Sequence, residues 1–332
     1  MVKLGYYIGA GLPERGPEIE LAREAERLGY DSAWVGESWG ADAVTQLAWL
    51  GALTSRIKLG SAVMQVPART PANCAMTAAT LDQLSGGRFL LGLGTSGPAV
   101  VEGWHGRAWR EPLTMLREYV EIVRAVLRRE PLEFQGRHYV IPHESGDGDE
   151  ARRPLKLRLR PVRTEIPIFL AAIAPRAVEL AAEIAEGWIP IFFVPEAARK
   201  VFPSMERARF EVAPIVRVVL TDDVQAGRDA LKPYYAFYIG GMGPRGKNFY
   251  NDLACHYGFE GEARVIQDRF LDGERAAAAA AVPDDFVDAV ALVGPKERIA
   301  ERVHAFGEAG ATTLIASTTD AAALRALADV AL

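Results

Sequence analysis

Cysteine and histidine are scarce in this 332-residue sequence. Its two cysteines, Cys74 and Cys255, lie far apart, which excludes a disulfide framework, a cysteine-rich zinc cluster and a CxxC redox site. The five histidines are not spaced as metal ligands, so we expect no metal. The net charge of −5 argues against general binding to nucleic acid or to a membrane surface.

Long apolar segments are also missing. No run approaches the ~18 apolar residues that are needed to cross a bilayer, and the beginning of the sequence lacks the apolar region of a signal peptide. We therefore expect a cytoplasmic protein whose partner is a small-molecule substrate.

Short apolar runs alternate with amphipathic segments along most of the chain. The expected strands begin near residues 3, 31, 56, 88, 166, 188, 211 and 312. Helices are expected between most of them, for example over 17–28, 71–84 and 295–308, whereas residues 222–292 show no convincing strand pattern. This alternation is typical of parallel strands with right-handed crossovers. It predicts an α/β fold, specifically a (β/α)8 TIM barrel in a single domain over 1–332, with insertions after the fourth and seventh strands. The alternative is an open doubly wound sheet.

The segment GLGTSG at 92–97 fits the G-x-G-x-x-G pattern of dinucleotide-binding sites. Only a short helix follows it, and no acidic residue ends a second strand about 20 residues later. We therefore interpret the segment as a glycine-rich loop at the barrel mouth, where backbone N–H groups can reach a ligand.

Four segments together carry a family resemblance: DSAWVGES at 31–38, RIKLGSAVMQVPARTP at 56–71, TLDQLSGGRFLLGLGTSGP at 80–98 and IPIFLAAIAPRAVELAAEIAEGW at 166–188. They resemble the bacterial luciferase-like flavin and deazaflavin oxidoreductases, and most closely the coenzyme F420-dependent branch that is similar to methylenetetrahydromethanopterin reductases. The resemblance implies a luciferase-like barrel that binds the deazaflavin at the carboxyl ends of its strands. It also implies hydride transfer at C5 of that ring, usually in a homodimer.

The resemblance assigns two groups of residues to the cofactor. The ring is expected at the end of the third strand, with a cis peptide between Ala62 and Val63. The phosphate arm is expected where the fifth strand runs into a helix, because small residues let the backbone approach and helix N-termini bind anions. The alternative for this second group is tight packing without a ligand. The residues are Ala62, Val63 and Met64 for the ring, and Ala171, Ala172, Ile173, Ala174, Pro175 and Arg176 for the arm; Gly94, Thr95 and Ser96 of the glycine-rich loop are further cofactor-binding candidates.

Acid–base candidates are few. Glu37 and Ser38 end the second strand, and we take them as the catalytic candidates. Some F420-dependent dehydrogenases carry an Asp-His pair there, so Ser38 argues against alcohol oxidation through this position. Glu37 could bind the deazaflavin or protonate a substrate, or it could instead pair with a buried arginine. The acid that those relatives carry after the fourth strand is missing.

Other residues extend the predicted site. Trp39, Trp104, His105 and Tyr250 are candidates for the substrate pocket, with ordinary packing and solvated surface as the alternatives. A basic strip could attract the oligoglutamate tail of F420, or could simply be a solvated surface. The strip comprises Arg152, Arg153, Lys156, Arg158, Arg160 and Arg163.

The leading hypothesis is therefore an F420-dependent oxidoreductase that acts on a small organic molecule. Two alternatives remain open: an FMN-dependent monooxygenase of the same fold, and a catalytically silent barrel that serves as a subunit or binding protein.

Overall fold

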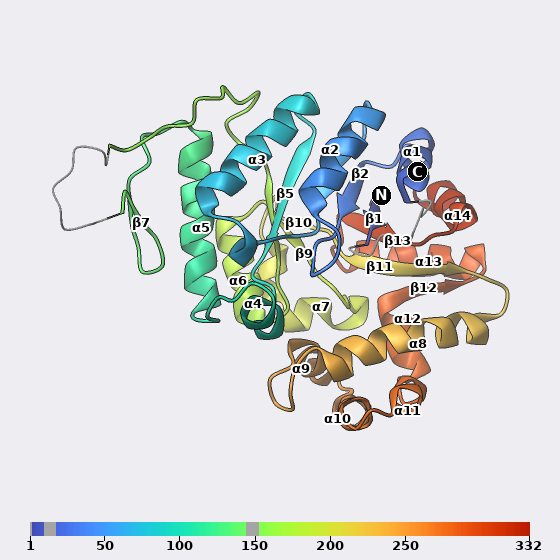
Figure 1. Ribbon diagram of the computed structural model, residues 1–332. Coiled ribbons are helices and arrows are strands. Elements are labelled where there is room, and N and C mark those ends of the chain that lie inside the picture. Colours follow the sequence, from blue (N-terminus) through green and yellow to red (C-terminus); the bar gives the residue numbers. More distant parts are fainter. Residues whose placement is uncertain (1, 10–17, 144–152) are drawn as a thin grey trace.

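A curled parallel β-sheet forms the centre of the molecule (Figure 1). The structure is a computed structural model, and it describes residues 2–9, 18–143 and 153–332. The strands of the sheet are β1 (Lys3–Ile8), β2 (Ser32–Val35), β3 (Lys58–Ser61), β4 (Met64–Gln65), β5 (Phe89–Gly94), β8 (Ile168–Ala171), β9 (Gly187–Ile189), β10 (Glu211–Val212), β11 (Ile215–Leu220), β12 (Ala291–Gly294) and β13 (Thr313–Ser317). A separate antiparallel hairpin pairs β6 (Phe134–Gln135) with β7 (Val140–Ile141).

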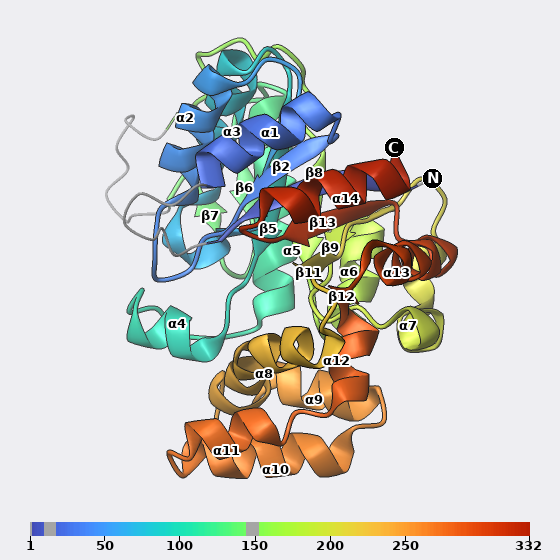
Figure 2. The ribbon, with the colours of Figure 1, turned by 90° about the vertical axis from the view of Figure 1, so that its right-hand side faces the viewer.

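Helices cover the outer side of the sheet and extend beyond the carboxyl ends of its strands, where α8 to α11 form a layer of their own (Figure 2). The helices are α1 (Glu18–Leu28), α2 (Ala43–Leu53), α3 (Pro71–Leu84), α4 (Pro98–Gly103), α5 (Pro112–Leu127), α6 (Pro175–Ile184), α7 (Pro195–Val201), α8 (Val224–Gly241), α9 (Phe249–His256), α10 (Glu260–Leu271), α11 (Arg275–Ala280), α12 (Asp284–Val290), α13 (Lys296–Glu308) and α14 (Ala321–Ala331). Within the described residues, none is both long and apolar enough to cross a membrane.

The strand order is β10-β9-β8-β5-β3-β2-β1-β13-β11-β12, with β4 beside β5. The segment 211–220 forms backbone hydrogen bonds with a different strand on each of its two sides. Ala213 N donates to Trp188 O of β9 (2.8 Å), while Ile315 N of β13 donates to Pro214 O (2.9 Å). The curl of the sheet therefore brings strands from its two sides to one segment.

The expected α/β fold with a parallel sheet is confirmed, with two differences in detail. The single strand expected from residue 211 is divided into β10 and β11, because Ala213 and Pro214 lie between them. Moreover, β12 begins within the region 222–292, where the sequence showed no convincing strand pattern. Its four apolar residues become a strand because β11 offers a free edge, with Arg217 opposite Ala291 and Leu220 opposite Gly294.

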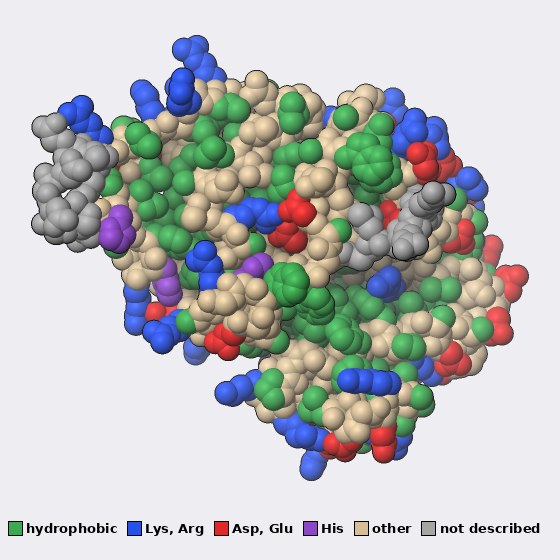
Figure 3. All heavy atoms as spheres, viewed as in Figure 1, with side chains coloured by type: hydrophobic (Ala, Val, Ile, Leu, Met, Phe, Trp, Pro, Cys, Tyr) green, Lys and Arg blue, Asp and Glu red, His purple; other side chains and the backbone are tan. Residues whose placement is uncertain are grey.

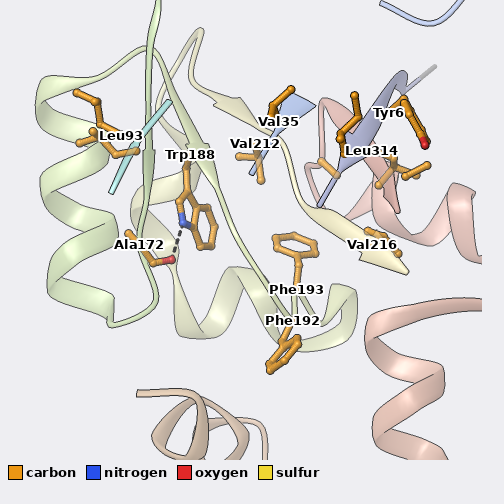
Figure 4. Close-up of a cluster of buried hydrophobic side chains, with 14 of the residues drawn as sticks. Tyr6, Val35, Leu93, Ala172, Trp188, Phe192, Phe193, Val212, Val216 and Leu314 are labelled. Carbon is orange, nitrogen blue, oxygen red and sulfur yellow. Dashed lines mark hydrogen bonds between the residues drawn. The ribbon is translucent and has the colours of Figure 1, made fainter. Parts of the chain in front are cut away.

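Buried side chains form two clusters on the two faces of the sheet. The inner one contains Trp34, Ala62, Leu90, Phe169, Ile189, Ala213 and Ile315. Trp34 fits there because a Cβ on Gly60 would lie only 2.2 Å from its ring. The larger cluster packs the outer face against the helices, and includes Trp188, whose Nε1 donates to the Ala172 carbonyl (2.9 Å; Figure 4). The inner cluster supports the edge at which the strands end.

Candidate active site

Three segments expected to hold the cofactor meet at the carboxyl edge of the sheet. The peptide between Ala62 and Val63 is cis, at the position implied by the family resemblance. A Cβ added to Gly94 would lie 2.6 Å from Val63 Cγ2 and 3.5 Å from Ala171 Cβ. The ends of β3, β5 and β8 therefore form one close-packed surface at this edge, where the missing side chain of Gly94 lets Val63 and Ala171 approach the backbone.

Not every expected ring or arm residue presents its side chain to this surface. Met64 is buried in the large core, as is Ala172, whose carbonyl is already bonded to Trp188. Only the backbone of Met64 can face a ligand here. Thr95 and Ser96 are partly exposed in the loop that follows β5, where the Thr95 hydroxyl donates to the Ser96 carbonyl (3.3 Å).

The beginning of α6 offers free backbone donors beside this surface. Ala174 occupies the N-cap position and Pro175 the first helical turn, and no side chain caps the helix. Arg176 is exposed and has no hydrogen bond or ion pair with any described residue. An uncapped helix start with a free guanidinium suits a phosphodiester, since both attract negative charge.

Glu37 is held tightly by an arginine that the sequence analysis did not single out. Arg69 donates to both carboxylate oxygens of Glu37 (2.7 Å each), and the backbone N–H of Gln65 donates to Glu37 Oε2 (3.0 Å). Both side chains are largely buried, with 7% of Glu37 and 15% of Arg69 exposed. This arrangement favours the alternative role of Glu37, the partner of a buried arginine, over that of a proton donor.

The same arginine joins a wider ionic group. Arg69 Nη2 also donates to Asp42 Oδ1 (2.6 Å), and Asp42 caps α2 through the Thr45 N–H (2.7 Å). Burial tends to raise the pKa of Asp42, but the hydrogen bonds from Thr45 and the charge of Arg69 outweigh it and lower that pKa. The bond to Glu37 raises the pKa of Arg69. These groups therefore stay ionised at neutral pH and position the end of β2 rather than exchange protons.

Gln65 links two further candidates. Its Nε2 donates to the Ser38 carbonyl (2.8 Å), and its Oε1 lies 3.4 Å from His105 Nε2. The structure thus brings Glu37, Ser38 and His105 together around Gln65, a residue that the sequence analysis missed. Its position directly after the small-residue strand end was the available signal.

The candidates for the substrate pocket divide into two groups. Trp39 and Trp104 are 48% and 66% exposed, and Trp104 precedes His105 at the end of α4. Tyr250 lies elsewhere, on α9, with its ring 4.8 Å from that of Tyr238 and 5.8 Å from that of Phe192. Tyr250 therefore belongs to an aromatic group that the helical layer adds to the site.

The basic strip does not lie near the predicted phosphate site. Arg163 donates to Asp82 (2.7 Å) and to the carbonyl of Phe89, where β5 begins, and Arg129 near the end of α5 donates to Leu157 O. The strip consequently follows the edge at which strands begin, opposite the beginning of α6. Arg153, Lys156, Arg158 and Arg160 are exposed without described ion pairs, which favours the solvated-surface alternative; Arg152 lies outside the described residues.

The opposite edge of the sheet also contains a cavity of about 330 Å³, beside Trp34 and Phe169. Ion pairs surround it, including Lys3 with Glu211 (2.7 Å) and Lys58 with Asp31 (2.9 Å). Arg88 and Arg209 also line the cavity without a described ion pair, so cations outnumber carboxylates in its lining. Among the described residues, no group of three His, Cys, Asp or Glu side chains could hold a metal.

Comparisons with known proteins agree on one family. The model of the family described as luciferase-like monooxygenase matches residues 5–313. A Mycobacterium tuberculosis protein with the provisional name coenzyme F420-dependent oxidoreductase is 40% identical, over 98% of this chain and 97% of its own length.

Solved structures show the same fold. The coenzyme F420-dependent tetrahydromethanopterin reductase from Methanopyrus kandleri superposes with a TM-score of 0.81 at 22% identity, over 99% of this chain and 98% of its own. An F420-dependent secondary alcohol dehydrogenase, solved with an F420–acetone adduct, superposes with a TM-score of 0.77 at 18% identity and the same coverage.

Proposed function

Because this chain belongs to the luciferase-like monooxygenase family, we propose that it is an oxidoreductase that uses coenzyme F420 and acts on a small organic molecule. The 40% identical relative, named for the same coenzyme, supports this choice. The observation that carries the proposal is the meeting of Val63, Gly94 and Ala171 at one edge, beside the uncapped beginning of α6.

The residues present fit the coenzyme. The close-packed surface of Ala62, Val63, Gly94 and Ala171 would support the ring. The backbone N–H groups of Ala174 and Arg176, together with the Arg176 guanidinium, would hold the phosphodiester. When bound, the deazaflavin supplies a ring carbon, C5, that accepts or donates a hydride.

The surrounding side chains orient the reactants. Glu37 and Arg69 fix the end of β2, and Gln65 holds the Ser38 carbonyl and the His105 ring on the same side. His105 then offers a donor or acceptor to the substrate, and the proton balance is completed by water. Glu37 contributes a fixed charge in this scheme, since its oxygens are already bonded.

We extend the proposal to the architecture. The curled sheet would be the expected (β/α)8 barrel within one domain, because residues 211–220 bond to strands on both sides. The elements from α4 to β7 and from α8 to β12 would be its two insertions. A cytoplasmic location stays a prediction.

A homodimer is part of the proposal as well. The outward side chains of α2 and α3, which lie side by side in Figure 1, carry no charge, and Trp49, Leu53, Met76 and Leu84 are exposed there. Exposed apolar surface of this kind marks interaction sites, and a second copy could bury it symmetrically.

The test is a titration of the purified protein with oxidised F420 and with FMN, followed by fluorescence. We expect F420 to bind and FMN to bind far more weakly. Arg176→Glu should weaken F420 binding tenfold or more, because it replaces a charge-assisted contact by repulsion. Arg160→Glu, an equally exposed change at the opposite edge, should leave it unchanged.

Two outcomes would contradict the proposal. Tight binding of FMN without binding of F420 would favour the monooxygenase alternative, in which reduced flavin activates O2. Binding of neither coenzyme would favour the catalytically silent barrel.

A further inference from the structure

Arg217 lies on the inner side of the sheet, close to the proposed cofactor surface. Along β11, Ile215 packs against the inner cluster, whereas Val216 and Val218 are buried in the outer core. Because side chains alternate along a strand, Arg217 faces the same side as Ile215. It lies where β11 is paired with Ser317, the last residue of β13, and thus at the carboxyl edge.

Arg217 lacks a counter-charge in the part of the chain that the structure describes. The comparably buried Arg69 and Arg228 are each paired with carboxylates at 2.7 Å or less. The Arg217 guanidinium has no such ion pair and no hydrogen bond to any described residue; its Cζ instead lies 4.1 Å from the ring centroid of Tyr234. A cation over an aromatic ring is only partly compensated for its lost hydration. A bound anion would therefore stabilise the Arg217 guanidinium.

Tyrosines from two elements lie near this guanidinium: Tyr7 of β1, and Tyr234, Tyr235 and Tyr238 of α8. Tyr250 of α9 packs against Tyr238 and extends the group. Their rings are in contact, with centroids 4.8 Å apart for Tyr234 and Tyr238 and also for Tyr238 and Tyr250. The buried Tyr235 hydroxyl has no hydrogen-bond partner among the described residues. Figure 3 shows hydrophobic side chains gathered in a hollow of the surface on this side of the molecule.

These phenols stay protonated at neutral pH. Burial raises the pKa of Tyr7 to about 12, against the lowering effect of the Arg217 charge. Burial also raises the pKa of Tyr235 and Tyr250 above the ordinary range. The group therefore combines one cation, neutral O–H donors and aromatic faces, which is the chemistry that receives a flat organic anion.

The arginine–tyrosine group adjoins the proposed cofactor surface. Tyr7 and Ile215 pack against the same inner cluster as Val63, next to the cis peptide. A molecule held by Arg217 would consequently reach the region where the ring is proposed to lie.

We propose that the substrate carries an oxyanion, a carboxylate or a phosphate, which Arg217 binds while the tyrosine rings cover the apolar remainder. This inference rests on the proposed function, because it assigns the substrate of that same site. Arg217 is here a binding residue, and the guanidinium can hold either oxyanion through paired N–H donors.

The experiment uses three probes of similar shape on the F420-loaded protein: benzoate, phenyl phosphate and neutral benzamide. We expect at least one of the two anions to bind saturably, by calorimetry or ligand-observed NMR, and tenfold or more tightly than benzamide. The anion that binds more tightly identifies whether the site prefers a carboxylate or a phosphate.

Variants then assign the effect to Arg217. Arg217→Gln should weaken anion binding tenfold or more, and Arg217→Lys should restore part of it because the charge remains. Arg160→Gln, exposed at the opposite edge, is the matched control and should have no effect. Circular dichroism and F420 titration of each variant verify that the fold and the cofactor site persist.

The proposal is overturned if neither anion binds, if benzamide binds equally well, or if Arg217→Gln leaves anion affinity unchanged. It is also overturned if Arg217→Gln weakens F420 as strongly as it weakens the anion, since Arg217 would then belong to the cofactor. Failure of the wild-type protein to bind F420 would instead refute the proposed function, and the probes are then applied to the unloaded protein.

Discussion

Among single residues, Glu37 shows how tertiary contacts change the interpretation of a sequence position. Its place at the end of β2 is compatible with a proton donor or with an arginine partner. The partner, Arg69, comes 32 residues later and donates to both carboxylate oxygens. Because both oxygens already accept hydrogen bonds from Arg69 and from the Gln65 backbone, neither is free to bind a substrate, so positioning is the better role.

We expect Glu37→Gln to lower the free energy of unfolding by about 2–4 kcal/mol, because it removes one partner of a largely buried ion pair. Urea denaturation measures this loss. The rate should fall, but the apparent pKa values of the pH–rate profile should not change. The disappearance of one limb of that profile with stability intact would instead identify Glu37 as the proton donor.

At the scale of elements, one junction depends on a partly exposed carboxylate that accepts several hydrogen bonds. Glu26 of α1 accepts backbone N–H groups from Ser55, Arg56 and Ile57 (2.8, 2.6 and 3.0 Å), and so connects α1 to the loop between α2 and β3. Burial tends to raise the pKa of Glu26, but these hydrogen bonds outweigh it and lower that pKa below the ordinary 4.5.

A lowered pKa stabilises the fold only where the unfolded carboxyl is ionised, so this contribution is present above pH 4.5 and is lost as the pH falls through the lower folded value. We expect Glu26→Gln to destabilise by about 1–2 kcal/mol at pH 7. Denaturation across a pH series should show the difference from wild type shrinking in acid. Glu121→Gln, an exposed change without a described hydrogen bond, should show no difference at either pH; a constant difference for Glu26→Gln would disprove the linkage.

At the scale of the whole molecule, the uncharged face of α2 and α3 predicts self-association. Trp49 and Met76 are 59% and 52% exposed, and placing charges there should oppose burial against a second copy. We expect the wild-type protein to be a dimer by light scattering and Trp49→Glu with Met76→Glu to be a monomer. Val265→Glu, at an exposed apolar position of α10, is the control. A monomeric wild type at micromolar concentration would refute the interface.

The sequence was sufficient for features that depend on neighbouring residues. Apolar runs alternating with amphipathic segments determined the parallel α/β fold, and Thr70 followed by Pro71 marked the beginning of α3, which Thr70 caps. Such patterns are readable because strand alternation and helix capping act over only a few residues. The family resemblance, rather than the local pattern, pointed to the strand ends at which Val63, Gly94 and Ala171 meet.

Only the tertiary structure decided which distant side chains meet. Arg69 reaches Glu37, Arg217 lies among tyrosines from positions 7 to 238, and β12 is a strand because the edge of β11 is free to pair with it. The basic strip has the composition of an anion site but lies at the wrong edge of the sheet. Each of these depends on the curl of the sheet, which sets which ends of distant strands become neighbours, and no local pattern records that geometry.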